Sequence, residues 1–196
     1  MLTINRQHNN KPFFNKIVML EALITSKTRI KLLLKFFLNS NNKAWLRLLE
    51  SEFGESTNAI RLELNRFQDA GLLISQNEGN KKIYKANTEH PLFTEINHLI
   101  IKHIGLDKVI DNIVLSLGEL NSVYLVGELA KGNNSNLIDL WFIGEKIDKN
   151  YLLILIEKAE KIIKRKIRYV ILNQEELQDF TKHKSKNEIL LLWKAE

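Results

Sequence analysis

Hydrophobic positions recur at intervals of three and four residues in three successive segments of the first half of the chain. This spacing gathers apolar side chains on one face of a helix, and Ser26 and Ser56 stand where such helices are capped. Gly54 and Gly71 follow the second and third segments, as glycine commonly does at helix C-termini. The apolar positions of the three predicted helices are Ile30, Leu33, Leu34 and Phe37, then Leu46, Leu48, Leu49 and Phe53, then Ile60, Leu64 and Phe67.

After the third helix, the pattern changes from a helical period to that of strands. Leu72–Gln76 and Lys81–Ala86 predict two strands, and the turn at Asn77–Asn80 contains Gly79, which can adopt positive φ. Helix, helix, short turn, helix and hairpin is the element order of a winged helix-turn-helix. In that arrangement the third helix lies in the DNA major groove and the hairpin, or wing, reaches the adjacent backbone.

The outward face of the third predicted helix carries side chains that hydrogen-bond base edges and phosphates. Any solvated helix also has a polar face, so the wing and the local charge are needed to favour DNA. Leu62 differs from its neighbours because it is apolar and points outward; it could meet a thymine methyl group or cover a neighbouring element. The candidate DNA-binding residues are Ser56, Thr57, Asn58, Arg61, Asn65, Arg66 and Gln68 on this helix, and Asn80, Lys81 and Lys82 at the wing.

The second half of the chain alternates between helical and strand periodicity, which predicts a small α/β domain. The fold class expected for the whole chain is therefore α+β, with the winged helix-turn-helix at the N-terminal end. The elements predicted after residue 105 are, in order, helix 106–117, strands 123–126 and 137–143, helix 149–164, strand 168–172 and a helix that starts after Asn173.

Between these two halves, Pro91 opens a predicted helix, 92–104, that is apolar around much of its circumference. A helix of this kind is usually covered on two sides. With Phe13–Leu23, it is expected to connect the halves and to form the surface of a homodimer. The expected division of the chain is an N-terminal arm 1–21, a DNA-binding domain 22–90, connecting and dimerisation helices 91–118, and a second domain 119–196.

Composition and charge narrow the class of protein. The net charge is +6, and all of the excess falls in residues 1–105, which hold 15 Lys and Arg against 9 Asp and Glu. Charge confined to one half favours a polyanion-binding face on that half. No cysteine is present, which excludes disulfides and thiolate metal sites. The longest apolar run, 151–156, is too short to span a membrane, and MLTINRQHNNKPFFNK is too polar for a signal peptide, so a cytoplasmic protein without a membrane partner is expected.

Two stretches carry a family resemblance. SKTRIKLLLKFFLNSNNKAWLRLLESEFGESTNAIRLELNRFQDAGLLISQNEGNKKIYKANTEHPLF, from Ser26 to Phe93, resembles the winged-helix module that bacteria and archaea place before a minimal nucleotidyltransferase domain. YLVGELAKGNNSNLIDLWFIG, from Tyr124 to Gly144, resembles the core of that domain, which belongs to the DNA polymerase β superfamily. The resemblance covers residues 22–180 and is most specific in the winged helix, including the junction NTEHPLF.

The resemblance implies a nucleotide site that this chain only partly retains. In the family, a Gly-Ser turn cradles the triphosphate, and aspartates on the following strands hold divalent metals. Here Gly127 and Gly132 match, but Glu128 stands in place of the serine. Leu137 replaces the first aspartate and leaves Asp139 alone, while the next strand supplies no acid. Gly127, Glu128, Gly132 and Asp139 are read as a degenerate nucleotide site in which only the two glycines and Asp139 are retained. No catalytic residue, bound metal or cofactor is therefore expected.

Together these patterns predict a homodimeric, DNA-binding regulator of transcription that is not an enzyme and whose partner is double-stranded DNA. Its second, nucleotidyltransferase-like domain would sense a small-molecule or protein effector, bind a partner or support the dimer. One alternative is an active, antitoxin-like nucleotidyltransferase that modifies a protein or RNA through a rebuilt metal site. Another is a protein–protein adaptor that does not bind DNA, although an adaptor has no need to gather the excess charge beside a wing.

Overall fold

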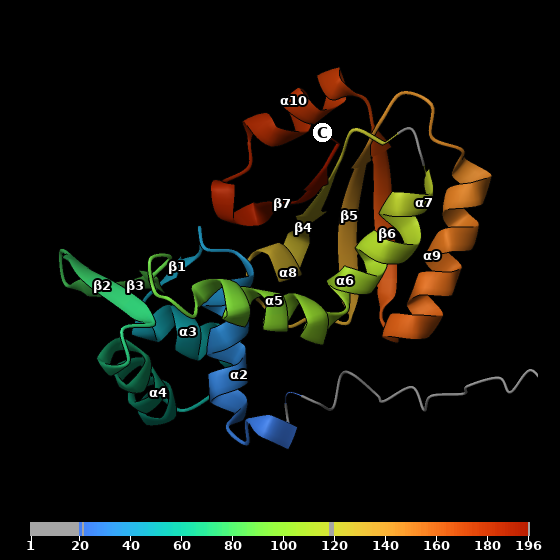
Figure 1. The fold of residues 1–196 in the computed structure, drawn as a ribbon. Helices are drawn as coiled ribbons and strands as arrows, with labels where there is room; N and C mark the ends of the chain where they lie inside the picture. Colours follow the sequence, from blue (N-terminus) through green and yellow to red (C-terminus); the bar gives the residue numbers. More distant parts are fainter. Residues whose placement is uncertain (1–19, 21, 118–119, 196) are drawn as a thin grey trace, which may run out of the picture.

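The computed structural model describes residues 20, 22–117 and 120–195. The chain has an α+β fold in two parts, as predicted (Figure 1). The first part combines helices with a three-stranded antiparallel sheet, and the second places helices around a four-stranded mixed sheet. No helix within the described residues is long and apolar enough to cross a membrane.

The helices of the first part begin and end close to where the sequence places them. The side chain of Ser26 accepts from the N–H of Arg29, and that of Ser56 accepts from the N–H of Ala59. Gly54 ends the second helix with a left-handed backbone, φ 62°. The helices are α2 (Lys27–Leu33), its π-helical continuation η1 (Leu34–Leu38), α3 (Leu46–Phe53) and α4 (Thr57–Asp69).

The small sheet contains the predicted hairpin and one unexpected strand. β2 (Leu73–Glu78) pairs with β3 (Lys81–Ala86) as far as Glu78 opposite Lys81, so the hairpin turn is two residues shorter than predicted. Gly79 adopts positive φ in that turn, as expected. β1 (Lys43–Ala44) pairs with the other edge of β3 and was not predicted, because two residues carry no periodicity.

The connecting helices are α5 (Phe93–Ile104), α6 (Leu106–Val109), η2 (Ile110–Val114) and α7 (Leu115–Leu117). The wide apolar face of α5 packs inside the chain: Ile100 and Ile104 are fully buried, and its other apolar residues pack against the same core. Much of the α5 face that was expected at a dimer surface is therefore buried within the chain, and the homodimer stays a prediction. Most of the other proposed dimer segment, Phe13–Leu23, lies outside the described residues.

The second sheet has the strand order β6-β5-β4-β7. Its strands are β4 (Ser122–Val126), β5 (Leu137–Ile143), β6 (Lys166–Leu172) and β7 (Ile189–Lys194). Parallel strands β5 and β6 are joined by α9 (Lys149–Ile163), whereas the other pairs are antiparallel. The edge strand β7 was not predicted. The remaining helices are α8 (Gly127–Ala130), α10 (Gln174–Lys182) and the 3-10 turn η3 (Lys186–Glu188).

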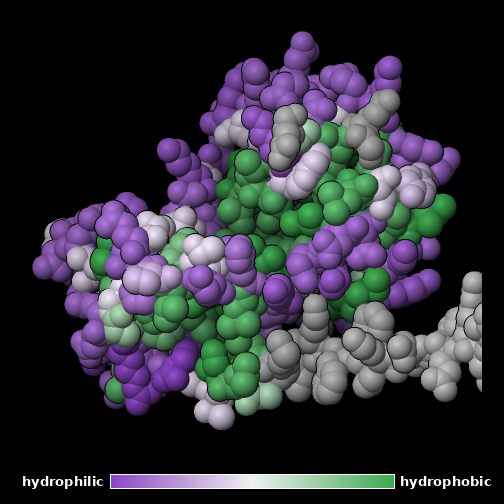
Figure 2. Space-filling model, viewed as in Figure 1, coloured by the Kyte–Doolittle hydropathy of each residue, from purple (hydrophilic) through white to green (hydrophobic). Residues whose placement is uncertain are grey.

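One hydrophobic core extends through both parts, from Leu20 and the helices of the first part to Ile167 on β6. A smaller cluster lies between the sheet and α10, around Trp141 and Leu177. The buried stripe of α9 runs through Leu152, Leu155 and Ile156, which leaves Leu153 47 % exposed. Figure 2 shows hydrophilic residues over α4 and the hairpin, and apolar residues gathered in the middle of the molecule.

Candidate functional site

Helix α4 presents the predicted DNA-binding residues on its exposed side. Ile60 and Leu64 are buried, which turns Asn58, Arg61 and Asn65 outward. The outward residues recur at intervals of three and four, so they follow one helical face. Arg61 donates a hydrogen bond to the Asn58 side chain at 3.4 Å. The stripe is therefore exposed, and this hydrogen bond joins two of its side chains.

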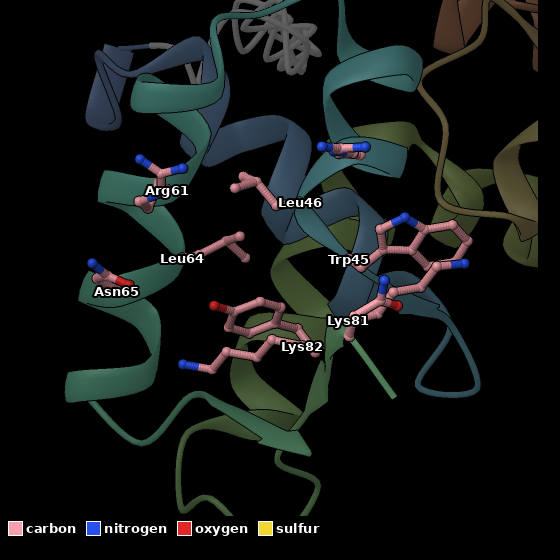
Figure 3. Close-up of a pocket in the computed structure, with 10 residues that line it drawn as sticks. Trp45, Leu46, Arg61, Leu64, Asn65, Lys81 and Lys82 are labelled. Carbon is pink, nitrogen blue, oxygen red and sulfur yellow. The ribbon is translucent and has the colours of Figure 1, made fainter. Parts of the chain in front are cut away.

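A basic groove of about 480 Å³ lies between α4, the start of α3 and the β2–β3 hairpin (Figure 3). Arg61 and Asn65 line it from α4, and Lys82 extends across it from the hairpin. None of the described residues that line the groove is acidic. Its charged and amide residues are Arg47, Arg61, Lys81, Lys82, Asn65 and Asn80.

Two aromatic rings hold the wing lysines in the basic groove. The Lys81 ammonium lies 4.2 Å from the ring centroid of Trp45, and the Lys82 ammonium lies 5.2 Å from that of Tyr84. Contacts of this kind contribute about 0.5–1 kcal/mol at exposed sites. Sequence reasoning missed Trp45, Arg47 and Tyr84. Tyr84 lies on β3, and the pairing of β1 with β3, Ala44 opposite Tyr84, brings Trp45 and Arg47 to the site.

Some predicted residues lie outside the basic groove. Arg66 donates to the Glu63 carboxylate at 3.1 Å and does not line the groove. Gln68 is half-buried, and its side-chain oxygen is inaccessible to solvent. Ser56 caps α4 through its hydroxyl, and Thr57 is half-buried in the first turn. The basic groove therefore contains Arg61, Asn65, Asn80, Lys81 and Lys82 of the predicted set.

The inner face of α4 is fixed by a buried acid that the sequence analysis did not single out. Glu63 is 4 % exposed and accepts two hydrogen bonds from Arg29 of α2, at 2.9 and 3.2 Å. Burial acts to raise the pKa of Glu63, but hydrogen bonds from Arg29 and Ser26 and the charges of Arg29 and Arg66 outweigh it and lower the pKa. The sequence signal that could have identified Glu63 is its place as an acid on the apolar side of an amphipathic helix. The contact sets the position of α4 against α2.

The degenerate nucleotide site lies where β4 and β5 pair, with Asp139 opposite Val126. Asp139 is 9 % exposed and accepts a hydrogen bond from the Nε of Arg168, its register partner on β6. This hydrogen bond and the attraction between the two charges raise the pKa of Arg168. The acid that the resemblance assigns to a metal is therefore paired with a side chain of the same sheet.

Glu128, the other acid of this site, is paired with residues of its own turn and the loop after it. The Glu128 carboxylate accepts from the Asn133 side chain at 2.8 Å and lies 3.7 Å from the Lys131 ammonium. Among the described residues there is no group of three or more His, Asp or Glu that could hold a metal ion. Mg²⁺ prefers several charged oxygen ligands, so the arrangement of Glu128 and Asp139 does not fit a catalytic metal pair.

Both glycines of the site are explained by close approaches within the chain. A Cβ at Gly127 would lie 2.6 Å from an oxygen of Asp139. A Cβ at Gly132 would lie 2.5 Å from the Cα of Lys35, which belongs to η1 in the first part. The two glycines also adopt positive φ, 72° and 77°, which disfavours other residues. The turn that would cradle a phosphate thus packs against the winged-helix part.

Two buried asparagines complete this contact between the parts. Asn39 donates from Nδ2 to the Ala130 carbonyl at 3.1 Å, and Asn42 donates to the same carbonyl at 3.3 Å. Asn42 also donates to the Lys35 carbonyl at 2.9 Å. Both asparagines are essentially inaccessible to solvent. We call residues 127–132, which receive these contacts, the joint turn.

Comparisons with known proteins reach only parts of the chain. No protein-family profile and no curated protein matches it. Reduced HlyU from Vibrio cholerae N16961 is similar in structure, with 22 % identity and a TM-score of 0.32, over 44 % of this chain and 81 % of HlyU. A candidate nucleotidyltransferase from Sulfolobus solfataricus has 22 % identity and a TM-score of 0.32, over 46 % of this chain and 78 % of that protein.

The class of fold follows from the element order and the strand pairing of the chain itself. The first part, with α2, α3, α4 and the β2–β3 hairpin in that order, is a winged helix-turn-helix. The second part is nucleotidyltransferase-like, with a mixed sheet and a glycine turn after β4.

Proposed function

We propose that this protein is a DNA-binding transcriptional regulator whose winged helix reads double-stranded DNA and whose second part is not catalytic. The observation that carries the proposal is the basic groove, which sets four cationic side chains and two amides between α4 and the wing. Phosphates give nucleic acids their dominant electrostatic affinity for such a surface. Its location beside the exposed face of α4 favours a duplex, because a helix fits the major groove.

Two kinds of side chain have different roles in the proposed complex. Arg61 and Asn65 can reach base edges, where a well-placed bidentate pair discriminates between bases by about 1–3 kcal/mol. Lys81 and Lys82 lie on the wing and would meet backbone phosphates, whose neutralisation releases counterions. Arg47, at the start of α3, is added to the phosphate contacts because it lines the same groove.

The second part is proposed to support the winged helix. Asp139 is paired with Arg168, and the joint turn packs against η1, so neither of these features remains for a metal-bound triphosphate. No observation favours the active-nucleotidyltransferase alternative. A homodimer stays part of the proposal, with the exposed Leu92 and Leu115 of the connecting segment as candidate contacts. A small-molecule or protein effector also remains a proposed partner.

The test is equilibrium binding to DNA duplexes over a series of salt concentrations. Lys81→Ala with Lys82→Ala should weaken binding to selected and scrambled duplexes alike and should flatten the log K versus log salt slope by about one to two units. Lys158→Ala with Lys161→Ala removes the same charge from the exposed face of α9 and should leave both quantities unchanged. Arg61→Ala should weaken binding to selected duplexes more than to scrambled ones. Unchanged affinity and slope in the wing variant would favour the adaptor alternative.

A further inference from the structure

Leu62 is an exposed leucine on the helix that carries the candidate base-reading residues. Its side chain is 52 % exposed, and it lies four residues after Asn58 and three before Asn65 on the same helix. Single exposed apolar residues are ordinary on protein surfaces, so exposure alone does not indicate a function for Leu62. Its location does, because Leu62 belongs to the outward face of α4.

The position of Leu62 around α4 defines where it would meet DNA. At 3.6 residues per turn, Leu62 lies about 60° around the helix from Asn65. Asn65 and Arg61 line the basic groove on the wing side, whereas Leu62 does not line it. With α4 in the major groove, Leu62 would therefore contact the groove on the side of Asn65 that faces away from the wing.

The chemistry of that contact is restricted by the side chain. An isobutyl group neither donates nor accepts a hydrogen bond, so it cannot recognise phosphates or polar base edges. The major groove offers one apolar group to such a side chain, the C5-methyl group of thymine. Resting on the proposed function, we infer that Leu62 reads a thymine methyl group beside the base contacted by Asn65 or Arg61. Leu62 is thus a specificity-determining residue for DNA.

Uracil scanning tests this assignment because uracil lacks only the methyl group of thymine. A duplex is first selected from random-sequence DNA with the wild-type protein, and each of its thymines is then replaced in turn by uracil. At one position or more, the wild-type affinity should fall about fourfold, which corresponds to about 0.8 kcal/mol for one buried methyl group. The same replacement should not change the affinity of Leu62→Ala. Leu62→Met, which keeps an apolar side chain, should show a smaller fall in affinity than the wild type.

Leu153→Ala is the matched control, because Leu153 is a leucine of similar exposure on α9 in the second part. It should keep the full wild-type sensitivity to uracil. If the wild type binds no duplex, the proposed function fails and this inference with it. Suppose that duplexes bind but that no thymine-to-uracil replacement lowers the wild-type affinity, or that Leu62→Ala loses as much affinity as the wild type does. Either result would overturn this inference and leave the proposed function standing. If Leu62-dependent binding responded to the methyl group of 5-methylcytosine but to no thymine methyl group, the assignment to thymine would be overturned.

Discussion

Asp139 and Arg168 face each other across β5 and β6, and their ion pair brings a fixed positive charge to the acid of the degenerate nucleotide site. Arg168 stands on the strand where the family resemblance expects a further carboxylate. A guanidinium at that position neutralises Asp139 and opposes the approach of a divalent cation. The Arg168 guanidinium therefore alters the electrostatics of the site in the direction opposite to that needed for metal binding.

Catalytic silence is the expected consequence at this residue. Purified protein with Mg²⁺ or Mn²⁺ and labelled ATP, UTP or CTP should transfer no label to itself, to RNA or to an added protein. The physical reason is that one paired carboxylate cannot replace the several charged ligands that two Mg²⁺ ions need. Label transfer that disappears in Asp139→Ala would contradict the expectation and revive the nucleotidyltransferase alternative.

Glu63 is the residue whose ionisation should make the winged-helix part sensitive to acid. Its pKa is lowered in the folded protein, so the unfolded chain takes up a proton more readily. The stabilisation by Glu63 is complete above its unfolded pKa, near the reference value of 4.5, and is lost as the pH falls through the lower folded pKa.

Urea unfolding of wild type and Glu63→Gln measures this effect. Between pH 7 and pH 3, the wild type should lose about 1–2 kcal/mol more free energy of unfolding than the variant, a value reduced because Arg29 is partly exposed. Glu89→Gln, at an exposed position, serves as the control and should follow the wild type. An equal acid-induced loss in all three proteins would show that Glu63 does not carry the sensitivity.

Among the secondary-structure elements, the shortest ones position the candidate sites. β1 has two residues, but its pairing with β3 brings Trp45 beside Lys81 of the wing. α8 has four residues, yet the joint turn that contains it packs against η1 of the other part. Both depend on contacts with distant segments, because a single turn or a two-residue strand is not stable alone.

Gly132→Ala is expected to damage the contact between the joint turn and η1. The new Cβ would lie 2.5 Å from the Cα of Lys35, and main-chain atoms cannot move aside as a flexible side chain can. Gly54→Ala is the matched control, since Gly54 also has positive φ but no heavy atom near its added Cβ. In urea unfolding, Gly132→Ala should lose about 1–3 kcal/mol more than Gly54→Ala, the usual cost of overpacking. Equal losses would mean that the two parts are not tightly joined there.

At the scale of the whole molecule, the two parts share one hydrophobic core, and α5 lies where they meet. This continuity explains why the wide apolar face of α5 does not remain on the surface. A homodimer would consequently use apolar positions that stay exposed, such as Leu92 and Leu115.

The sequence by itself determined the elements whose signals are local. Caps at Ser26 and Ser56, glycines at helix ends and the period of the apolar residues predict α2, α3, α4 and the hairpin, because these features act within a few residues of the chain. The charge of the first half and the departures at Glu128 and Leu137 are likewise readable directly.

Only the tertiary structure decided which distant segments meet. The pairing of β7 with β4, the register that places Arg168 beside Asp139, and the approach of Lys35 to Gly132 join residues far apart in the chain. Sequence periodicity shows that a face will be buried but does not name its partner, since apolar burial is non-directional. The partner is fixed by strand register and close packing, which exist only once the chain has folded.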